Sequence, residues 1–508
     1  MEVSASRSKA IFVFPAAAGH VNPSLPLARG LVLAGWDVDY LATATFKVAI
    51  QDTGATFCDR DAVCREHGIE DVTAMVKATA SEYGDPVPQW WLNFGSISTA
   101  ALLPIYIDWF RSRHAQLVVY CPVLCQVALF AALQLKVPAV SLLTASGPGY
   151  FDAAIASMAG AGAVRGVAAG LVNAVKAVEP NAAAIESIRS QLGMSGLTLN
   201  TTEPLCCDYY CGTNLVSTTE ELSDPLCARD EEYYRSVGKR FFFVGPLLGA
   251  SGAKRGEQAQ EGPGELMRRV EAAAAGSRTV VYVSMGTVVT SDNEDHGWNA
   301  TDGSSITGRQ LCQSVFRAVF EELGSAEPDA PLIVVSLGPQ PGALAGVVVP
   351  PNAVCAASVP QVDLLRAGKP ALFVTNGGQN SLMESMSVGT PVLVCPGFGD
   401  QLTNADKVVA RGWGAKVARP PRLCGGGEDG TPAAADADAA ATAYQARVRS
   451  GVRAVLDGAD FAKQARRIAD GLKRAEGVDG ALRLLLSEAA GRQPPAAPAA
   501  EKSGVLSS

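Results

Sequence analysis

The chain has 508 residues, of which 48% are hydrophobic and 18% charged, and its net charge is −8. This length and composition exclude a disordered protein and predict two globular domains with sizeable cores. The acidic balance argues against nucleic-acid binding, which favours a basic surface. The polar residues 1–9 and the absence of a long apolar stretch predict a cytoplasmic protein without a transmembrane segment.

The first predicted unit is a strand, a helix and a second strand. Ala10–Pro15 is a short apolar run typical of a buried parallel strand, and a loop over 16–21 follows it. Asn22-Pro23 then reads as a helix cap with proline at the first helical position, and Gly35 closes that helix. Val38–Ala42 is the next strand, so we expect a βαβ unit.

The same alternation continues along the chain in two series. The first adds the predicted strands Leu117–Tyr120, Ala139–Leu143, Leu215–Thr218 and Phe241–Val244. The second contains the predicted strands Thr279–Ser284, Leu332–Ser336, Ala371–Thr375 and Pro391–Cys395. Two such series predict an α/β protein with two doubly wound domains.

Composition shifts set the predicted domain boundaries. Five segments are expected: an N-terminal domain over 1–248, a linker over 249–264, a C-terminal domain over 265–442 with a flexible stretch at 425–441, helices over 443–490 that pack back toward the N-terminal domain, and a disordered tail over 491–508.

The most informative segment follows the strand Ala371–Thr375. Asn376–Gly378 is a tight turn, and a helix opens at Asn380. Backbone N–H groups and a positive helix end at the carboxyl end of a parallel strand favour an anion such as a pyrophosphate. Asn380 and Glu384 share a helix face, so one can donate to phosphate while the other accepts from ribose hydroxyls. The two glycines alone do not distinguish such an anion site from an ordinary strand–turn–helix connection.

The surrounding residues resemble the signature of family 1 UDP-glycosyltransferases, among them the macrolide and plant secondary-metabolite glucosyltransferases. In that order the chain has Pro360-Gln361, Asn376-Gly377-Gly378-Gln379-Asn380-Ser381, Glu384 and Asp400-Gln401. Gly19-His20-Val21-Asn22-Pro23, Val244-Gly245-Pro246-Leu247 and Tyr282-Val283-Ser284-Met285-Gly286-Thr287 resemble other elements of the family. The resemblance covers roughly 450 residues. It implies two facing Rossmann-like domains, the GT-B fold, with the donor in the C-terminal half.

The resemblance also implies a role for each matching residue. The nucleoside would be bound by Val359, Gln361 and Glu384. The pyrophosphate would be bound by Thr287, Asn376, Gly377, Gly378, Asn380 and Ser381. The sugar hydroxyls would be read by Asp400 and Gln401. No metal and no cofactor are expected, because a helix end stabilises the departing diphosphate and a UDP-sugar serves as co-substrate. The expected partners are that donor and a small acceptor; the sequence does not indicate an oligomeric state.

His20 is the expected general base. It lies just before the predicted helix start, where the helix dipole disfavours its charged form and lowers its pKa. A neutral imidazole can take the proton of an acceptor hydroxyl, which then attacks the anomeric carbon with inversion. The sequence therefore predicts an enzyme, a hexosyltransferase that acts on a small, mostly apolar acceptor.

Two departures from the family pattern leave alternatives open. Cys121 stands where the family has an aspartate that holds the base, and Asn376 stands in place of a phosphate-binding histidine. A neutral thiol stabilises an imidazolium poorly. The alternative is a non-catalytic nucleotide-sugar-binding protein of the same fold. An epimerase or hydrolase of UDP-sugars has no sequence support of its own.

Overall fold

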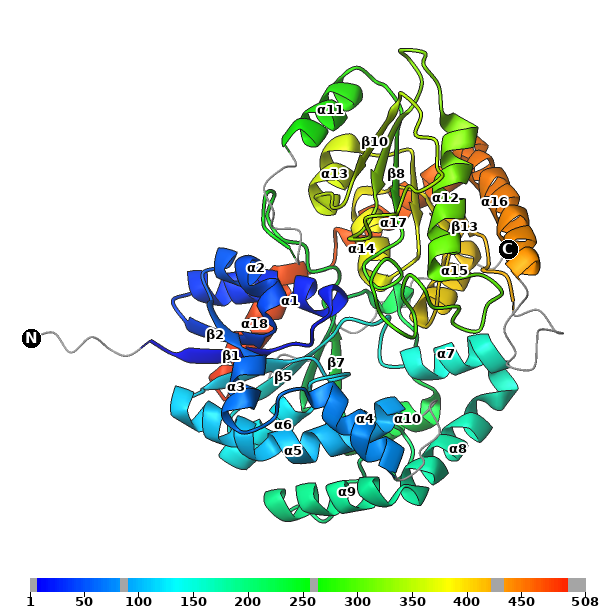
Figure 1. Cartoon of the computed structure of the whole chain (residues 1–508). Coiled ribbons are helices and arrows are strands. Elements are labelled where there is room, and N and C mark those ends of the chain that lie inside the picture. Colours follow the sequence, from blue (N-terminus) through cyan, green and yellow to red (C-terminus); the bar gives the residue numbers. More distant parts are fainter. Residues whose placement is uncertain (1–6, 83–89, 256–263, 422–433, 492–508) are drawn as a thin grey trace, which may run out of the picture.

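The computed structural model describes residues 7–82, 90–255, 264–421 and 434–491, which form two α/β domains, each built on one parallel sheet (Figure 1). The predicted fold class is confirmed. Among the described helices, none combines the length and the apolar character needed to cross a bilayer.

The N-terminal domain contains a seven-stranded sheet in the order β3-β2-β1-β4-β5-β6-β7. Its strands are β1 (Lys9–Val13), β2 (Asp37–Ala42), β3 (Thr56–Asp59), β4 (Leu117–Tyr120), β5 (Ala139–Leu143), β6 (Thr213–Val216) and β7 (Arg240–Phe243). The chain runs outward from β1 to β3 and then returns to β4 on the other side of β1. Val13 and Tyr120 are in register, so the segments that follow β1 and β4 meet at one sheet edge.

The C-terminal domain repeats this plan with six parallel strands in the order β10-β9-β8-β11-β12-β13. They are β8 (Val280–Ser284), β9 (Leu332–Ser336), β10 (Ala353–Ala356), β11 (Leu372–Thr375), β12 (Val392–Val394) and β13 (Gly414–Lys416). Here the strand order reverses between β8 and β11, and Ser284 pairs with Thr375. Ligands of open parallel sheets bind at such reversals.

Helices cover both sheets. In the N-terminal half they are α1 (Ala18–Leu33), α2 (Lys47–Asp52), α3 (Arg60–Glu66), α4 (Val72–Glu82), α5 (Trp90–Arg113), α6 (Val127–Leu135), α7 (Tyr150–Ala159), α8 (Val164–Ala177), α9 (Glu179–Leu192) and α10 (Ala228–Ser236). In the C-terminal half they are α11 (Gly264–Ala275), α12 (Gly308–Leu323), α13 (Gln361–Gly368), α14 (Gln379–Val388), α15 (Asp400–Ala410), α16 (Ala434–Asp457), α17 (Ala459–Leu472) and α18 (Gly477–Ala489).

Helix α1 begins earlier than predicted. It starts at Ala18, so His20 lies in its first turn and Pro23 lies inside the helix. Proline has no N–H, so Pro23 leaves the carbonyl of Gly19 without its helical partner. That carbonyl accepts a hydrogen bond of 2.7 Å from Asn380 Nδ2 of the C-terminal domain. The Asn22-Pro23 pair, which resembles a helix start, thus leaves the Gly19 carbonyl free to accept a hydrogen bond from the other domain.

The C-terminal helices correct two predicted boundaries. Helix α16 begins at Ala434, so the predicted flexible stretch is helical over 434–441; residues 425–433 lie outside the described residues. Helices α16 and α17 pack on α12 and α14 of the C-terminal domain. Of the helices described after residue 433, α18 returns to the N-terminal domain, where Ala481 and Leu485 are part of its core. Of the predicted tail, only Gly491 is described.

The chain crosses between the domains twice, and the crossings touch. The first follows β7, and the second lies between α17 and α18. The N–H of Gly477 donates to the carbonyl of Val244 at 2.7 Å. A Cβ at Gly245, whose φ is +80°, would lie 2.5 Å from Ala475 Cβ. The two connections therefore run side by side at one place on the domain boundary.

Candidate active site

The turn after β11 is shaped by its glycine and asparagine. Gly377 has a φ of +82°, and a Cβ there would lie 2.4 Å from Val394 Cγ1, so glycine is required. Asn376 Oδ1 accepts from the N–H of Gly378 at 3.3 Å, which holds the turn in place before α14 begins. A Cβ at Gly286, just after β8, would lie 2.6 Å from Asn376 Nδ2. The strand reversal thus brings both predicted phosphate-binding segments together.

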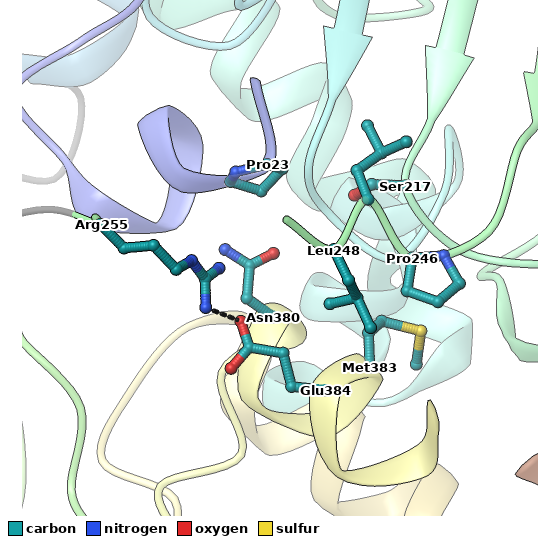
Figure 2. A pocket seen from close by; sticks show the side chains of 9 residues that line it. Pro23, Ser217, Pro246, Leu248, Arg255, Asn380, Met383 and Glu384 are labelled. Atoms are coloured by element: carbon teal, nitrogen blue, oxygen red, sulfur yellow. Dashed lines mark ion pairs between the residues drawn. The ribbon is translucent and has the colours of Figure 1, made fainter. Parts of the chain in front are cut away.

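The predicted nucleoside-binding residues form one hydrogen-bonded set. Gln361 opens α13, and its Oε1 accepts from the hydroxyl of Tyr282 at 3.0 Å. Its Nε2 donates to Ser381 Oγ at 3.1 Å and to Glu384 Oε2 at 2.7 Å. The other carboxylate oxygen of Glu384 forms an ion pair of 2.7 Å with Arg255 (Figure 2). The amide of Gln361 and the carboxylate of Glu384 therefore lie side by side, and each is bound by other protein groups.

The predicted sugar-reading residues lie next to the phosphate turn. Asp400 is the first residue of α15, and burial raises the pKa of its carboxyl to about 6. Asn404, one turn later, donates to Asp400 Oδ2 at 3.3 Å and to the carbonyl of Gly377 at 3.0 Å. The Oε1 of Gln401 accepts from the N–H of Gly397 at 2.9 Å, which fixes the loop before α15.

The predicted base lies where the N-terminal sheet reverses. His20 is partly buried, and its Nδ1 lies 3.2 Å from Cys121 Sγ and 3.0 Å from Thr144 Oγ1. Cys121 follows β4 and Thr144 follows β5, so the three residues come from neighbouring strand ends. A proton on Nδ1 shared with the Thr144 oxygen leaves Nε2 free to accept another.

The imidazole ring of His20 and its two neighbours, Cys121 and Thr144, are all neutral. Burial lowers the pKa of His20 to about 4, which agrees with the predicted direction but replaces the helix dipole as its main cause. Burial also raises the pKa of the Cys121 thiol to about 12. Near neutral pH, His20 is therefore an unprotonated imidazole without a charged partner.

The donor turn and the base meet at the domain boundary. Asn380 binds the carbonyl of Gly19, the residue before His20. Ser146 Oγ, from the N-terminal domain, lies 3.0 Å from Gln379 Oε1 and 2.7 Å from Asn404 Oδ1. Beside these contacts is a small hollow, open to solvent and lined by residues of both domains, among them Pro23, Asn380 and Glu384 (Figure 2).

Two predicted residues stand apart from these contacts. Thr287 is exposed in the loop that follows Gly286. The side chain of Val359 is buried in the core of the C-terminal domain, so it contributes packing there. Sequence reasoning missed Thr144, Asn404 and Arg255. The position of Thr144 directly after the strand next to β4 was the available signal for the first of them.

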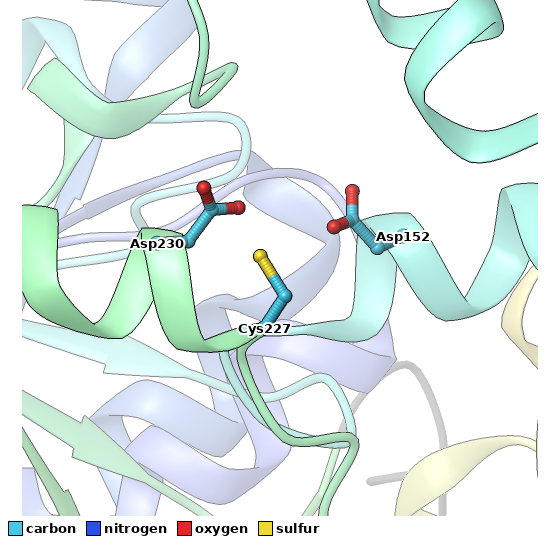
Figure 3. Close-up of side chains that lie close together, drawn as sticks. All are labelled: Asp152, Cys227 and Asp230. Atoms are coloured by element: carbon cyan, nitrogen blue, oxygen red, sulfur yellow. The ribbon is translucent and has the colours of Figure 1, made fainter.

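One group of acidic and thiol side chains lies outside this site. Among the described residues, Asp152, Cys227 and Asp230 offer ligand atoms within 4.8 Å of one another, between α7 and α10 (Figure 3). The Nε of Arg229 already donates to Asp230 at 2.9 Å, and burial raises the pKa of Asp152. Asp230 is thus already paired with a guanidinium.

Comparison with known sequences points to one family. Residues 251–419 match the family described as UDP-glucoronosyl and UDP-glucosyl transferase. Human UDP-glucuronosyltransferase 3A2 is 46% identical over 59 residues, which are 12% of this chain and 11% of that protein. UDP-glycosyltransferase CGT of Oryza sativa subsp. japonica is 32% identical over 202 residues, or 39% of each protein. The matched segments thus span well under half the length of these relatives.

Solved structures resemble the whole chain. The glycotransferase of kitacinnamycin has a TM-score of 0.60 at 20% identity, and the match covers 95% of this chain and 99% of that one. CalG4, the calicheamicin glycosyltransferase, has a TM-score of 0.59 at 16% identity, with 97% and 100% covered. These likenesses show the GT-B fold. Residues 251–419, which include most of the C-terminal domain, match the transferase family, and the whole chain has the fold of these glycosyltransferases.

Proposed function

We propose that the chain is an inverting glycosyltransferase that moves a hexose from a UDP-sugar to a hydroxyl of a small, mostly apolar acceptor. The hydrogen bond from Asn380 to the carbonyl of Gly19 carries this proposal. It holds the start of α14, which suits a diphosphate, against the first turn of α1, which contains His20. The donor and the base are then on facing sides of one boundary.

In the proposed reaction, Nε2 of His20 takes the proton of the acceptor hydroxyl. The oxygen attacks the anomeric carbon of the hexose, and the bond from that carbon to the diphosphate breaks with its electron pair on the leaving UDP. The N–H groups at the start of α14 stabilise the leaving charge. The neutral His20 is ready to accept a proton, but Cys121 and Thr144 offer the resulting imidazolium no opposite charge.

The donor-binding groups are occupied by protein partners in the closed arrangement. Asn380 binds Gly19, and Glu384 binds Gln361 and Arg255. A nucleotide that used these groups would replace the partners, which requires the domains to separate and close again. Two similar structures were determined with thymidine diphosphate, VinC and the spinosyn rhamnosyltransferase SpnG, so a thymidine donor belongs in the test.

The test is product analysis by mass spectrometry with a mixed library of hydrophobic alcohols and phenols. UDP-glucose, UDP-galactose, UDP-glucuronate, UDP-N-acetylglucosamine and dTDP-glucose are offered as separate donors. We expect glycoside formation with stoichiometric release of the nucleoside diphosphate. Binding of a donor without any product, across the library, would reject the transferase.

Two observations favour a second function, a non-catalytic nucleotide-sugar-binding protein. The thiol of Cys121 is neutral where a carboxylate would support the base, and Asn376 carries no charge beside the proposed phosphate. In such a protein, His20→Ala would leave any measured activity unchanged, and Cys121→Asp would not raise it. Donor hydrolysis without an acceptor would instead indicate a hydrolase of the same fold.

A further inference from the structure

Arg255 is a charged residue at the proposed donor site that the sequence prediction did not include. It lies in the first crossing between the domains, yet its side chain is only 19% exposed. Its guanidinium reaches into the hollow at the domain boundary and meets Glu384, whose side chain is 3% exposed (Figure 2). Asn380, at the start of α14, lines the same hollow.

The charges around this hollow are unbalanced for a diphosphate. Among the described residues that line it, Arg255 is the one cation and Glu384 the one anion. The turn after β11 offers N–H groups and the neutral side chains of Asn376, Asn380 and Ser381. A helix start contributes about half a positive charge, which is less than a diphosphate carries. A further cation within reach would complete the site.

A guanidinium suits this role better than other side chains. It stays charged at all relevant pH values and presents two parallel N–H groups that match phosphate oxygens. Arg255 is held near the site by one strong contact, its pair with Glu384. Ribose hydroxyls can donate to that carboxylate in its place, and the guanidinium is then free to turn toward the phosphates.

We propose that Arg255 binds the diphosphate of the nucleotide donor and supplies the positive charge that Asn376 lacks. This inference rests on the proposed function. In the empty site Arg255 neutralises Glu384, and in the filled site the ribose takes over Glu384 while Arg255 contacts the phosphate oxygens.

The test compares UDP with uridine by isothermal titration calorimetry, because only UDP carries the diphosphate. Arg255→Ala should weaken UDP binding about tenfold or more and leave uridine binding within about twofold. Arg255→Lys keeps the charge but loses the paired donors, so its affinity for UDP should lie between those of the unaltered protein and Arg255→Ala. The matched control is Lys254→Ala, which removes the neighbouring exposed cation of the same crossing and should change neither affinity.

A second measurement separates phosphate binding from loss of a counterion. Without Arg255, the unpaired Glu384 would itself repel a phosphate. In the Glu384→Gln background this repulsion is absent, and we still expect Arg255→Ala to weaken UDP binding several-fold relative to Glu384→Gln alone.

Three results would overturn the assignment. UDP binding unchanged by Arg255→Ala would show that the guanidinium does not reach the phosphates. Equal weakening of UDP and uridine would show that Arg255 only positions Glu384. Tighter binding of both would show that Arg255 blocks the site. If the unaltered protein binds neither UDP nor dTDP, the proposed function itself fails, which is a separate outcome.

Discussion

The two sides of the domain boundary follow the family pattern to different degrees. On the C-terminal side, Gln361, Glu384 and Asp400 are in matching positions, and hydrogen bonds join them to their neighbours. On the N-terminal side, His20 is in place, but Cys121 and Thr144 replace a charged partner with neutral ones. Donor binding and proton transfer can therefore be altered independently, and the proposed chemistry is weakest at the base.

Removing the base should give the largest effect. We expect His20→Ala to lower the rate of transfer by about a hundredfold to ten-thousandfold, the usual contribution of a positioned general base. UDP affinity should stay the same, because the nucleotide groups lie in the other domain. Steady-state kinetics and calorimetry on the same preparation measure both, and exposed His67→Ala is the control. A parallel loss of rate and UDP affinity would contradict the separation of the two sides.

The turn on the donor side can be broken with a matched pair of variants. Gly377→Ala places a methyl group 2.4 Å from Val394 Cγ1 at a φ of +82°, and we expect it to lower the free energy of unfolding by about 2–4 kcal/mol. Gly378→Ala meets nothing closer than 3.7 Å and should cost less than about 1 kcal/mol. Urea denaturation compares them. Similar losses in both would show that the turn geometry of Gly377 is not required.

Supplying the missing charge should sharpen the contrast. Cys121→Asp places a carboxylate beside His20 Nδ1, which raises the pKa of the imidazole and stabilises the imidazolium formed in the reaction. We expect the rate to rise about tenfold. Cys121→Asn has the same shape without the charge and should leave the rate unchanged. An equal rate in both variants would favour the non-catalytic alternative.

The pH dependence of stability should give the smallest effect, because two groups oppose each other. The folded-state pKa of Asp400 is raised to about 6, so its stabilising contribution is full below the unfolded value and disappears as pH rises through 6. The folded-state pKa of His20 is lowered to about 4, so its contribution is full above the unfolded value and disappears as pH falls through 4.

Each contribution amounts to roughly 3 kcal/mol, and between pH 4 and 6 the two changes run in opposite directions. We therefore expect Asp400→Asn to uncover the loss of stability that His20 causes in this window. Urea denaturation at pH 4.5, 5.5 and 7 measures it. A variant whose stability varies with pH as the unaltered chain's does would show that these two groups do not dominate.

All the central strands could be predicted from the sequence, but of the four edge strands only β7 could. Every predicted strand is present, with ends that differ by at most two residues. The strands that were missed are β3, β10 and β13, and each lies at a sheet edge. An edge strand is covered on fewer sides: β10 is only half-buried along its length, and β13 has three residues. β3 and β13 lack the apolar run that identifies a buried parallel strand, and β10 has only a short run of mostly small residues.

The candidate site could be predicted where a motif fixes the residues, and not where tertiary contacts do. The turn of Asn376–Gly378 and the position of His20 follow from local sequence. Thr144 is a single hydroxyl after a strand, and Arg255 lies in a Gly- and Ala-rich crossing, so only the folded chain reveals their neighbours. The predicted start of α1 was wrong because Pro23 resembles a first helical residue. In the structure Pro23 lies inside the helix.

The paired connections between the domains have a mechanical consequence. One tether would let the domains twist about any direction. Here Gly477 is bonded to Val244 and Gly245 packs on Ala475, so the polypeptide passes through a single narrow joint in both directions. A joint of this kind acts as a hinge, which favours rotation of the two domains about one axis. Pro246 and Leu247, directly after this joint, line the same hollow as Asn380, so a rotation about the joint would open and close the boundary beside the proposed donor site.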